Sequence, residues 1–219
     1  MQTTEIKKLS ESLAALIRKL GSNPSMNNLT MPELLAESRL TRGDIEPFSY
    51  YEHPQTESYG RLMIYQSERI KVFVLTWNTG DFTAIHDHEP AEWGSVLFFG
   101  DLTHRLYTIE NDQVILRQAD IFHSGNRVGV TGSLVHAMGN LSAVPALTLH
   151  IYGTNSQFGT GLNARVFDLE MGRAVMTDGA AFLSRNHADS IILPDRIWAD
   201  GATLSDYKRN TSIWRAKHT

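Results

Sequence analysis

Residues 102–117 read LTHRLYTIENDQVILR, and this stretch has the pattern of a β-hairpin. Two runs rich in β-branched and aromatic side chains, Leu102–Ile109 and Gln113–Arg117, flank the dipeptide Asn111-Asp112. Asn and Asp tolerate the left-handed backbone conformation, so such a dipeptide between two strand-like runs is typical of a tight turn. The stretch therefore predicts two antiparallel strands.

Short runs of the same character lie on both sides of this hairpin, between residue 47 and about residue 178. They are separated by Gly, Asn, Asp and Ser, with no helical stretch between them. Many short strands without interleaved helices favour a mainly β fold, an antiparallel barrel or jelly roll, over a parallel α/β sheet. The other predicted strands are Arg61–Gln66, Ile70–Trp77, Thr83–His88, Ser95–Phe99, Ala119–His123, Ser133–Met138, Ala146–Tyr152 and Arg165–Leu169.

The segment before the strands has a helical pattern. Apolar residues recur at helical spacing from Glu5 to Leu20, with Thr4 as the N-cap and Gly21 as the stop. A second helix start follows, where Thr30 and Glu33 have capping-box spacing. We therefore predict three segments: an N-terminal helical segment (1–46), the barrel (47–178) and a C-terminal arm (179–219) that packs on the barrel or on a partner.

The composition excludes several classes of protein. The chain is 42% hydrophobic and 20% charged with a formal net charge of −4, and it has no Lys/Arg-rich run of the kind that binds nucleic acid or a membrane surface. It contains no cysteine, which excludes disulfides, zinc-thiolate sites, iron–sulfur clusters and a cysteine nucleophile. A metal must use His, carboxylate or water. Without a signal-peptide pattern or a run of ~20 apolar residues, we expect a cytoplasmic protein.

Residues 80–88, GDFTAIHDH, carry the first chemical signal. Side chains alternate along a strand, so His86 and His88 share one face, and inside a barrel their nitrogens need partners that a metal ion can provide. His136 lies on a later predicted strand and is a candidate third ligand. Neutral imidazoles suit iron, copper, nickel or zinc better than magnesium or calcium. The alternative is a group of hydrogen-bonded structural histidines.

The remaining histidines have no partner at ligand spacing. We interpret His53, His104, His187 and His218 as structural or solvated, and we keep His123 as a rival third ligand.

The pattern resembles the cupin superfamily. Its first motif, a glycine followed after five residues by His-x-His and then a distal glycine, is matched by Gly80, His86, His88 and Gly100. The second motif is matched in part, by His136 four residues before an asparagine. The register that holds a glutamate ligand in cupins falls on Trp93 and not on Glu92. We therefore favour a three-histidine site, with Glu92 kept as an optional fourth ligand.

Three further stretches resemble the cysteine dioxygenase family of thiol dioxygenases, and the resemblance runs from about Tyr59 to Asp168. They are the Tyr-x-Arg strand at Tyr59 and Arg61, a tryptophan (Trp77) before the metal motif, and a Ser/Thr-x-His-x-Tyr strand at residues 148–152. The resemblance implies Fe(II)-dependent addition of both atoms of O2 to the sulfur of a small thiol carboxylic acid, with L-cysteine favoured as substrate and cysteine sulfinate as product. The alternatives are another metal-dependent cupin (a 3-His-1-Glu dioxygenase or isomerase), a 3-mercaptopropionate-type dioxygenase, or a non-enzymatic ligand-binding cupin.

The resemblance also implies a role for each matching residue. His86, His88 and His136 would bind one Fe(II), and Arg61 would hold the substrate carboxylate. The Tyr152 hydroxyl would donate a hydrogen bond at the reacting centre. The resemblance further implies that His150 orients this tyrosine, that Thr148 fixes His150, and that the substrate pocket is lined by Tyr59, Arg61, Trp77 and Trp93.

Two departures from the family pattern bear on this expectation. Some members carry a cysteine near position 93 that crosslinks to the active-site tyrosine, whereas this chain has Trp93, so Tyr152 would act uncrosslinked, as in bacterial members. Relatives that act on 3-mercaptopropionate tend to have glutamine at the position of Arg61, which tilts the expected substrate toward L-cysteine. The oligomeric state, monomer or dimer, is left open.

Overall fold

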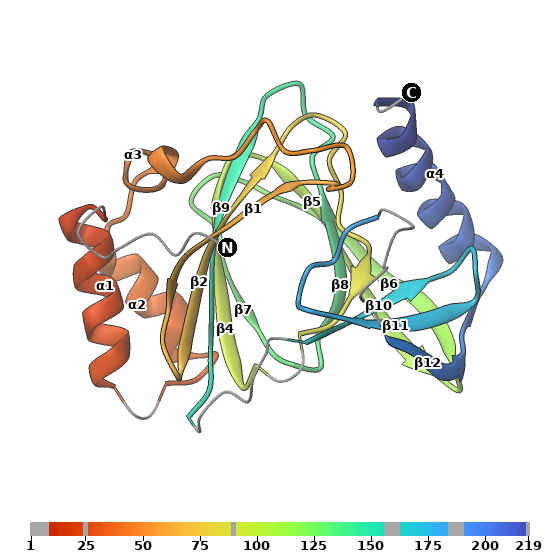
Figure 1. Ribbon diagram of the computed structural model, residues 1–219, viewed down its shortest axis with the longest axis horizontal. Coiled ribbons are helices and arrows are strands. Elements are labelled where there is room, and N and C mark those ends of the chain that lie inside the picture. The colour runs from red at the N-terminus through yellow and green to blue at the C-terminus, as the bar shows by residue number, and fades with distance from the viewer. Residues whose placement is uncertain (1–8, 24–25, 89–90, 156–162, 184–190, 218–219) are drawn as a thin grey trace.

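The computed structural model describes residues 9–23, 26–88, 91–155, 163–183 and 191–217. The predicted fold class is confirmed: the described chain is mainly β, with an antiparallel barrel and an N-terminal helical segment (Figure 1). The helices are α1 (Glu11–Ser22), α2 (Thr30–Ser38), α3 (Arg42–Ile45) and α4 (Gly201–Lys217). The strands are β1 (Gly60–Gln66), β2 (Ile70–Trp77), β3 (Ile85–His86), β4 (Trp93–Phe99), β5 (Leu102–Glu110), β6 (Gln113–Phe122), β7 (Arg127–Val130), β8 (Val135–Gly139), β9 (Ala146–Gly153), β10 (Ala164–Asp168), β11 (Arg173–Thr177), β12 (Ile191–Arg196) and β13 (Trp198–Ala199).

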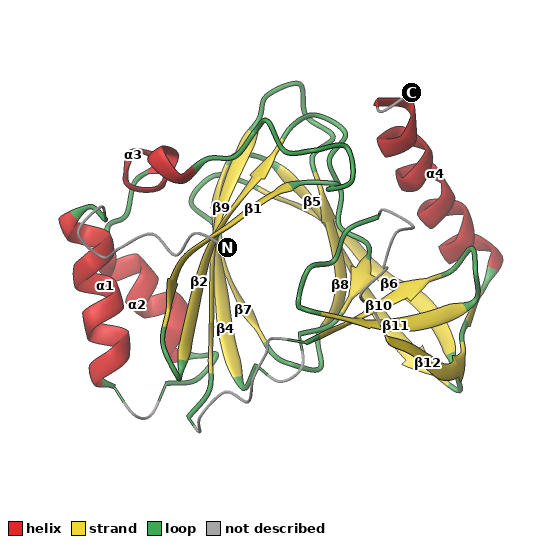
Figure 2. Cartoon of the chain, viewed as in Figure 1, coloured by secondary structure: helices red, strands yellow, loops and turns green. Residues whose placement is uncertain are grey.

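The strands form two sheets, which together make the barrel (Figure 2). One has the order β1-β2-β9-β4-β7, and the other has the order β12-β11-β10-β3-β8-β5-β6-β13. Within the described residues the neighbouring strands are antiparallel, apart from the short parallel pairing of β13 with β6. The predicted hairpin is β5 and β6, and its turn residues Asn111 and Asp112 both have positive φ.

Strand β2 of the first sheet is buried along its whole length, which explains its apolar run Val72–Leu75. Val72 and Val74 belong to a cluster with Leu13 of α1, on the face that α1 and α2 cover (Figure 1). Phe73 and Leu75 belong to a second cluster, to which strands of both sheets contribute. Because side chains alternate along a strand, each strand of this sheet sends every second residue into the barrel. The interior positions are therefore fixed by register.

Helix α4 lies against the second sheet, next to β6. The Oγ1 atom of Thr203 accepts a hydrogen bond from the backbone of Leu116 in β6. Three ion pairs then tie α4 to the barrel: Arg105 with Asp206, Glu170 with Arg215, and Asp81 with Lys217. The described part of the C-terminal arm thus contacts the barrel of its own chain. The boundaries at residues 46 and 178 stay predictions.

Several local predictions need correction. Helix α1 begins after Ser10, whose side chain caps it, and it continues through Gly21; the predicted cap Thr4 lies outside the described residues. Helix α2 begins at Thr30 as predicted, but the capping oxygen belongs to Asn27. The strand predicted over Thr83–His88 is ladder-paired only at Ile85–His86, and the two strands predicted between residues 113 and 123 are one continuous strand. Strands β7, β11, β12 and β13 and helix α4 were not predicted, whereas α3 lies within the predicted helical segment.

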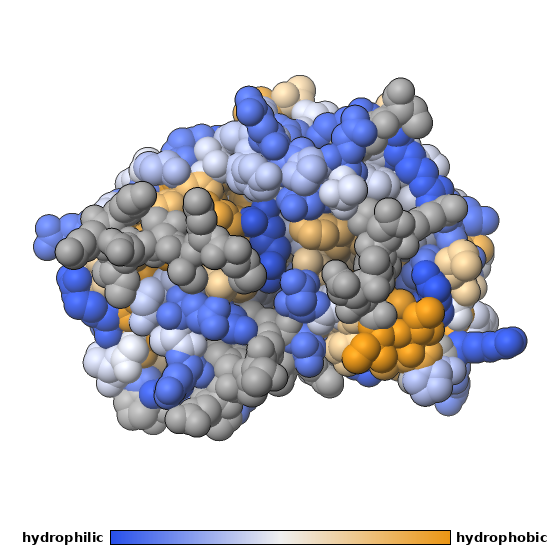
Figure 3. All heavy atoms as spheres, viewed as in Figure 1, coloured by the Kyte–Doolittle hydropathy of each residue, from blue (hydrophilic) through white to orange (hydrophobic). Residues whose placement is uncertain are grey.

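Strand β12 is an edge strand with an apolar surface. Ile191 and Ile192 are 69% and 61% exposed, and apolar atoms gather over this strand (Figure 3).

Among the described residues, no helix combines the length and the apolar character needed to cross a membrane.

The close approach of β9 to Trp93 gives a stability prediction. A Cβ atom on Gly153 would lie 2.0 Å from Cζ2 of Trp93, whereas a Cβ on Gly21, in α1, would meet nothing within 4 Å. We expect Gly153→Ala to lower the free energy of unfolding by about 1–3 kcal/mol, because a buried ring must move. Gly21→Ala is expected to raise it by about 0.5–1 kcal/mol, as alanine favours the helix. Urea unfolding of both variants measures the contrast; equal stability would contradict the close approach.

Candidate metal centre and its cavity

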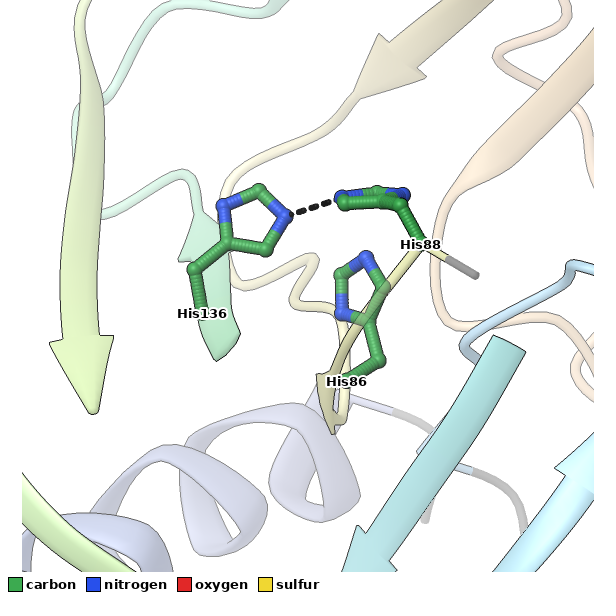
Figure 4. A group of neighbouring side chains, drawn as sticks. All are labelled: His86, His88 and His136. Carbon is green, nitrogen blue, oxygen red and sulfur yellow. Dashed lines mark hydrogen bonds between the residues drawn. The ribbon is translucent and has the colours of Figure 1, made fainter. Parts of the chain in front are cut away.

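Three histidines converge inside the barrel (Figure 4). His86 of β3 is the register partner of His136 of β8, and His88 follows β3 on the same face as His86. One ring nitrogen from each histidine can be chosen so that all three lie within 4.8 Å of one another. The three residues are 6%, 7% and 2% exposed, in the order His86, His88 and His136. The candidate ligands from two separate parts of the sequence are thus brought together.

The outer nitrogens of two rings already have partners. Nδ1 of His86 lies 2.9 Å from the carbonyl oxygen of Ala84, and Nδ1 of His136 lies 2.7 Å from Nε2 of His104. Nε2 of His88 and Nε2 of His136 are 2.7 Å apart. Two ligands at right angles around a metal bound at about 2.1 Å are roughly 3 Å apart, so small shifts would admit an ion. This buried group could hold a metal ion.

Burial also sets the protonation of the histidines in and around this group. It lowers the pKa of His86 and His104 to about 4 and that of His150 to about 3, and the pKa values of His88 and His136 lie well below the ordinary value. All five rings are therefore neutral at pH 7. Neutral imidazoles are the form that binds metal, because the charged ring has no lone pair to offer.

These shifts predict an acid-sensitive fold for the metal-free protein. Histidine in the unfolded chain has a pKa of about 6.5. Below this pH the unfolded chain binds protons that the folded chain does not, so the free energy of unfolding falls as the pH drops toward 4. Each buried histidine lowers the free energy of unfolding by up to about 1.4 kcal/mol for each pH unit in this range. We expect His150→Gln to reduce this slope, measured by urea unfolding between pH 7 and 5. Substitution of the exposed His123 is the control, and an unchanged slope in His150→Gln would count against this account.

The three rings open into a cavity between the two sheets. Asp87, between the two histidines in sequence, points to the other face, where its carboxylate accepts hydrogen bonds from the backbone and side chain of Arg165. The cavity is lined by Tyr59, Arg61, Phe73, Leu75, Trp77, Thr83, His86, His88, His136, Met138, His150, Tyr152, Asn163, Ala164 and Gly179.

A chain of hydrogen-bonding side chains forms one wall of the cavity. Nε1 of Trp77 donates to Oγ1 of Thr148 at 2.9 Å. Oγ1 of Thr148 lies 2.8 Å from Nε2 of His150, and Nδ1 of His150 lies 2.9 Å from the Tyr152 hydroxyl. The Tyr152 ring stacks on His88 with the ring centroids 5.0 Å apart. Burial raises the pKa of Tyr152, so its hydroxyl stays protonated. The chain therefore connects a buried tryptophan to the three-histidine group.

Strand β1 contributes a cation to the same cavity. The Arg61 guanidinium lies over the ring of Phe73, 4.2 Å from its centroid. Within the described part of the chain, Arg61 makes no ion pair within 4 Å, although its charge opposes the rise that burial causes in the pKa of the Glu57 carboxyl. Tyr59 stacks on Trp77 with 5.1 Å between the centroids, and its hydroxyl accepts a hydrogen bond from the backbone of Ala181. The cavity thus offers a guanidinium whose hydrogen-bond donors are available to an anionic ligand.

Three residues that were predicted as a pocket residue or as candidate ligands do not lie in the cavity. Trp93 is buried with the helix-side cluster, because odd-numbered residues of β4 face α1 and α2, so its assignment to the substrate pocket is wrong. Glu92 is exposed, and its carboxylate accepts hydrogen bonds from Thr154 and Asn155. His123 is exposed and bonded to Asp101. Neither residue belongs to the three-histidine group.

The sequence analysis missed the contact of His104 with one of the three histidines. His104 was interpreted as structural or solvated, but it is 3% exposed and bonded to His136. Its partner lies 32 residues away, and no spacing within one strand could have indicated the contact. His187 and His218 lie outside the described residues.

Comparisons with known proteins give weak structural likenesses. No protein-family model matches the sequence. A Klebsiella pneumoniae protein with a double-stranded β-helix domain has 15% identity and a TM-score of 0.41, over 56% of this chain and 90% of its own. A cupin superfamily protein from Desulfitobacterium hafniense has 14% identity and a TM-score of 0.34, over 43% and 76%. Bacillus subtilis oxalate decarboxylase, which has Mn(II) centres, has 14% identity and a TM-score of 0.34, over 43% and 24%. All three TM-scores lie below 0.5, so these likenesses assign neither a family nor a function to this chain.

Proposed function

We propose that this chain is an Fe(II)-dependent thiol dioxygenase that oxidises a small thiol carboxylic acid, with L-cysteine as the favoured substrate. One observation carries the proposal: the polar chain through Thr148, His150 and Tyr152 ends against the ring of His88, in a cavity that also holds Arg61. These are the residues of the motifs that resemble the cysteine dioxygenase family. They come from β1, from β9 and from the segment that follows β3, so their meeting in one cavity supports a shared task.

The reaction is balanced without a further reductant. The thiol sulfur loses four electrons and O2 accepts them; the O–O bond breaks and two S–O bonds form. The product is the sulfinic acid, which releases its proton to solvent at neutral pH. Iron bound by His86, His88 and His136 would supply the redox chemistry that lets O2 react with a thiolate, and three imidazoles are a donor set that suits iron.

Arg61 would select and orient the substrate. Its planar guanidinium can donate two parallel hydrogen bonds to a carboxylate, and the Phe73 ring beneath it restrains its plane. A substrate held at this end would direct its sulfur toward the histidine group, which lines the same cavity. The cavity therefore favours a short thiol with a terminal carboxylate.

Tyr152 would donate a hydrogen bond to the reacting groups. An indole N–H can only donate, so Trp77 occupies one lone pair of the Thr148 oxygen. If Thr148 then donates to Nε2 of His150, Nδ1 of His150 donates to the Tyr152 oxygen and leaves the tyrosine proton free for the cavity. Because His150 is neutral, it would orient Tyr152 and would not act as an acid itself.

Oxygen uptake tests the proposal directly. The protein is loaded with Fe(II) without air and then given O2 with L-cysteine, 3-mercaptopropionate or cysteamine, and the products are identified by mass. We expect uptake of one O2 per thiol, a gain of two oxygen atoms on sulfur, and a preference for the thiols that carry a carboxylate. Uptake with none of the three thiols would overturn the proposal, and a preference for 3-mercaptopropionate would reassign the substrate.

A further inference from the structure

We propose that His104 is a positioning residue that fixes the tautomer of His136, an inference that rests on the metal centre of the proposed function. Nε2 of His104 lies 2.7 Å from Nδ1 of His136, and His104 is 3% exposed. The contact crosses from β5 to β8, where the register partner of His104 is Met138. Two neighbouring strands therefore hold the two rings in place.

The hydrogen-bond pattern has two self-consistent directions. In one, His104 donates through Nε2 to His136, which donates through its own Nε2 to His88. In the other, His88 donates to His136, and Nδ1 of His136 donates to Nε2 of His104. Each direction places one proton between each pair of rings. The tautomer of His136 differs between them.

Only one direction is compatible with a ligating His136. Its outer nitrogen Nδ1 faces His104, so the nitrogen that faces the other two histidines is Nε2. A lone pair at Nε2 requires the proton at Nδ1, and that proton needs an acceptor. His104 offers Nε2 as that acceptor. A partner behind a ligating histidine is a common way to fix tautomer and ring orientation.

The other nitrogen of His104 supports this role. With Nε2 as the acceptor, the proton of His104 lies on Nδ1, which is buried without a hydrogen-bond partner in the described part of the chain. The ring of Phe122 lies beside it, 5.0 Å away between centroids. A histidine that served the fold alone would be better placed with both nitrogens satisfied. The buried Nδ1–H of His104 has no hydrogen-bond partner, which costs stability, while Nε2 of the same ring is the acceptor for His136.

Metal affinity and a matched pair of variants test the proposal. His104→Phe removes the acceptor but keeps a ring in the apolar surroundings, whereas His104→Gln keeps an acceptor oxygen. With Co(II) as the probe, titrated by its visible absorption, we expect His104→Phe to weaken binding by about 10–100-fold. His104→Gln is expected to restore most of the loss. Substitution of the exposed His123 by Phe is the control and should leave the affinity unchanged.

The tautomer can also be read in the unmodified protein. In the Zn(II)-loaded, nitrogen-15-labelled protein, the ring-nitrogen shifts should show Nδ1 of His136 protonated and its Nε2 metal-bound. The opposite assignment would overturn the proposal, as would equal losses of affinity in His104→Gln and His104→Phe. If the unmodified protein binds neither Fe(II) nor Co(II), the proposed function itself fails. Binding that His104→Phe leaves unchanged removes only the role of His104.

Discussion

Replacing His88 with alanine is expected to leave a folded protein that no longer retains iron. The group has only three histidine donors, and loss of a partner that merely supports a ligand already costs about 10–100-fold in affinity. Direct loss of a ligand should cost at least about 100-fold. Iron content after anaerobic loading and desalting measures the effect, and oxygen uptake with L-cysteine should disappear with it.

The control for this variant is His123→Ala. The ring of His123 is exposed, bonded to Asp101 and outside the three-histidine group, so its removal should leave iron content near that of the unmodified protein. Circular dichroism separates loss of a ligand from loss of the fold. Full iron content in folded His88→Ala would mean that the metal lies elsewhere.

Replacing Arg61 with alanine is expected to keep iron but to impair the use of thiols that carry a carboxylate. Removal of one member of a hydrogen-bonded charge pair in a cavity costs about 3 kcal/mol, close to 100-fold in kcat/KM. Cysteamine has no carboxylate, so its turnover should change far less. The measurement is kcat/KM for L-cysteine, 3-mercaptopropionate and cysteamine, with iron content determined on the same samples.

Arg127→Ala is the matched control, because Arg127 is an exposed arginine of β7 that does not line the cavity. It should leave all three values unchanged. Equal losses of kcat/KM for L-cysteine and cysteamine in Arg61→Ala would show that Arg61 does not hold the carboxylate. The proposal of a metal-dependent thiol oxidation would stand, with a different group as the anchor.

Local alternation was enough to predict the paired histidines. His86 and His88 are two residues apart, so an extended backbone places both side chains on one face. The same alternation explains the meeting of Thr148, His150 and Tyr152. Strand order along the chain also predicted an antiparallel barrel, because no helical pattern separates the runs.

Contacts that depend on register or on distant strands were beyond such reasoning. Trp93 was assigned to the pocket, but the register of β4 turns it toward the helices, where Gly153 leaves room for its ring. The partnership of His104 with His136 depends on how β5 pairs with β8. The face that helix α4 buries mixes polar and apolar side chains, so apolar periodicity could not indicate this helix. Its buried residues are Thr203, Tyr207, Asn210, Thr211 and Trp214.

The anchoring of Asp81 has a consequence for the order in which this protein assembles. Its carboxylate is fully buried and accepts hydrogen bonds from the backbone of Asn78, from His53 and from Lys217, which lies 136 residues further along the chain. A contact of such sequence separation forms late in folding, because closing a long loop costs entropy. On the ribosome, the loop that leads into His86 emerges well before the lysine that fastens it. Strand β3 and the following His88 are therefore expected to gain their final rigidity only after α4 has docked.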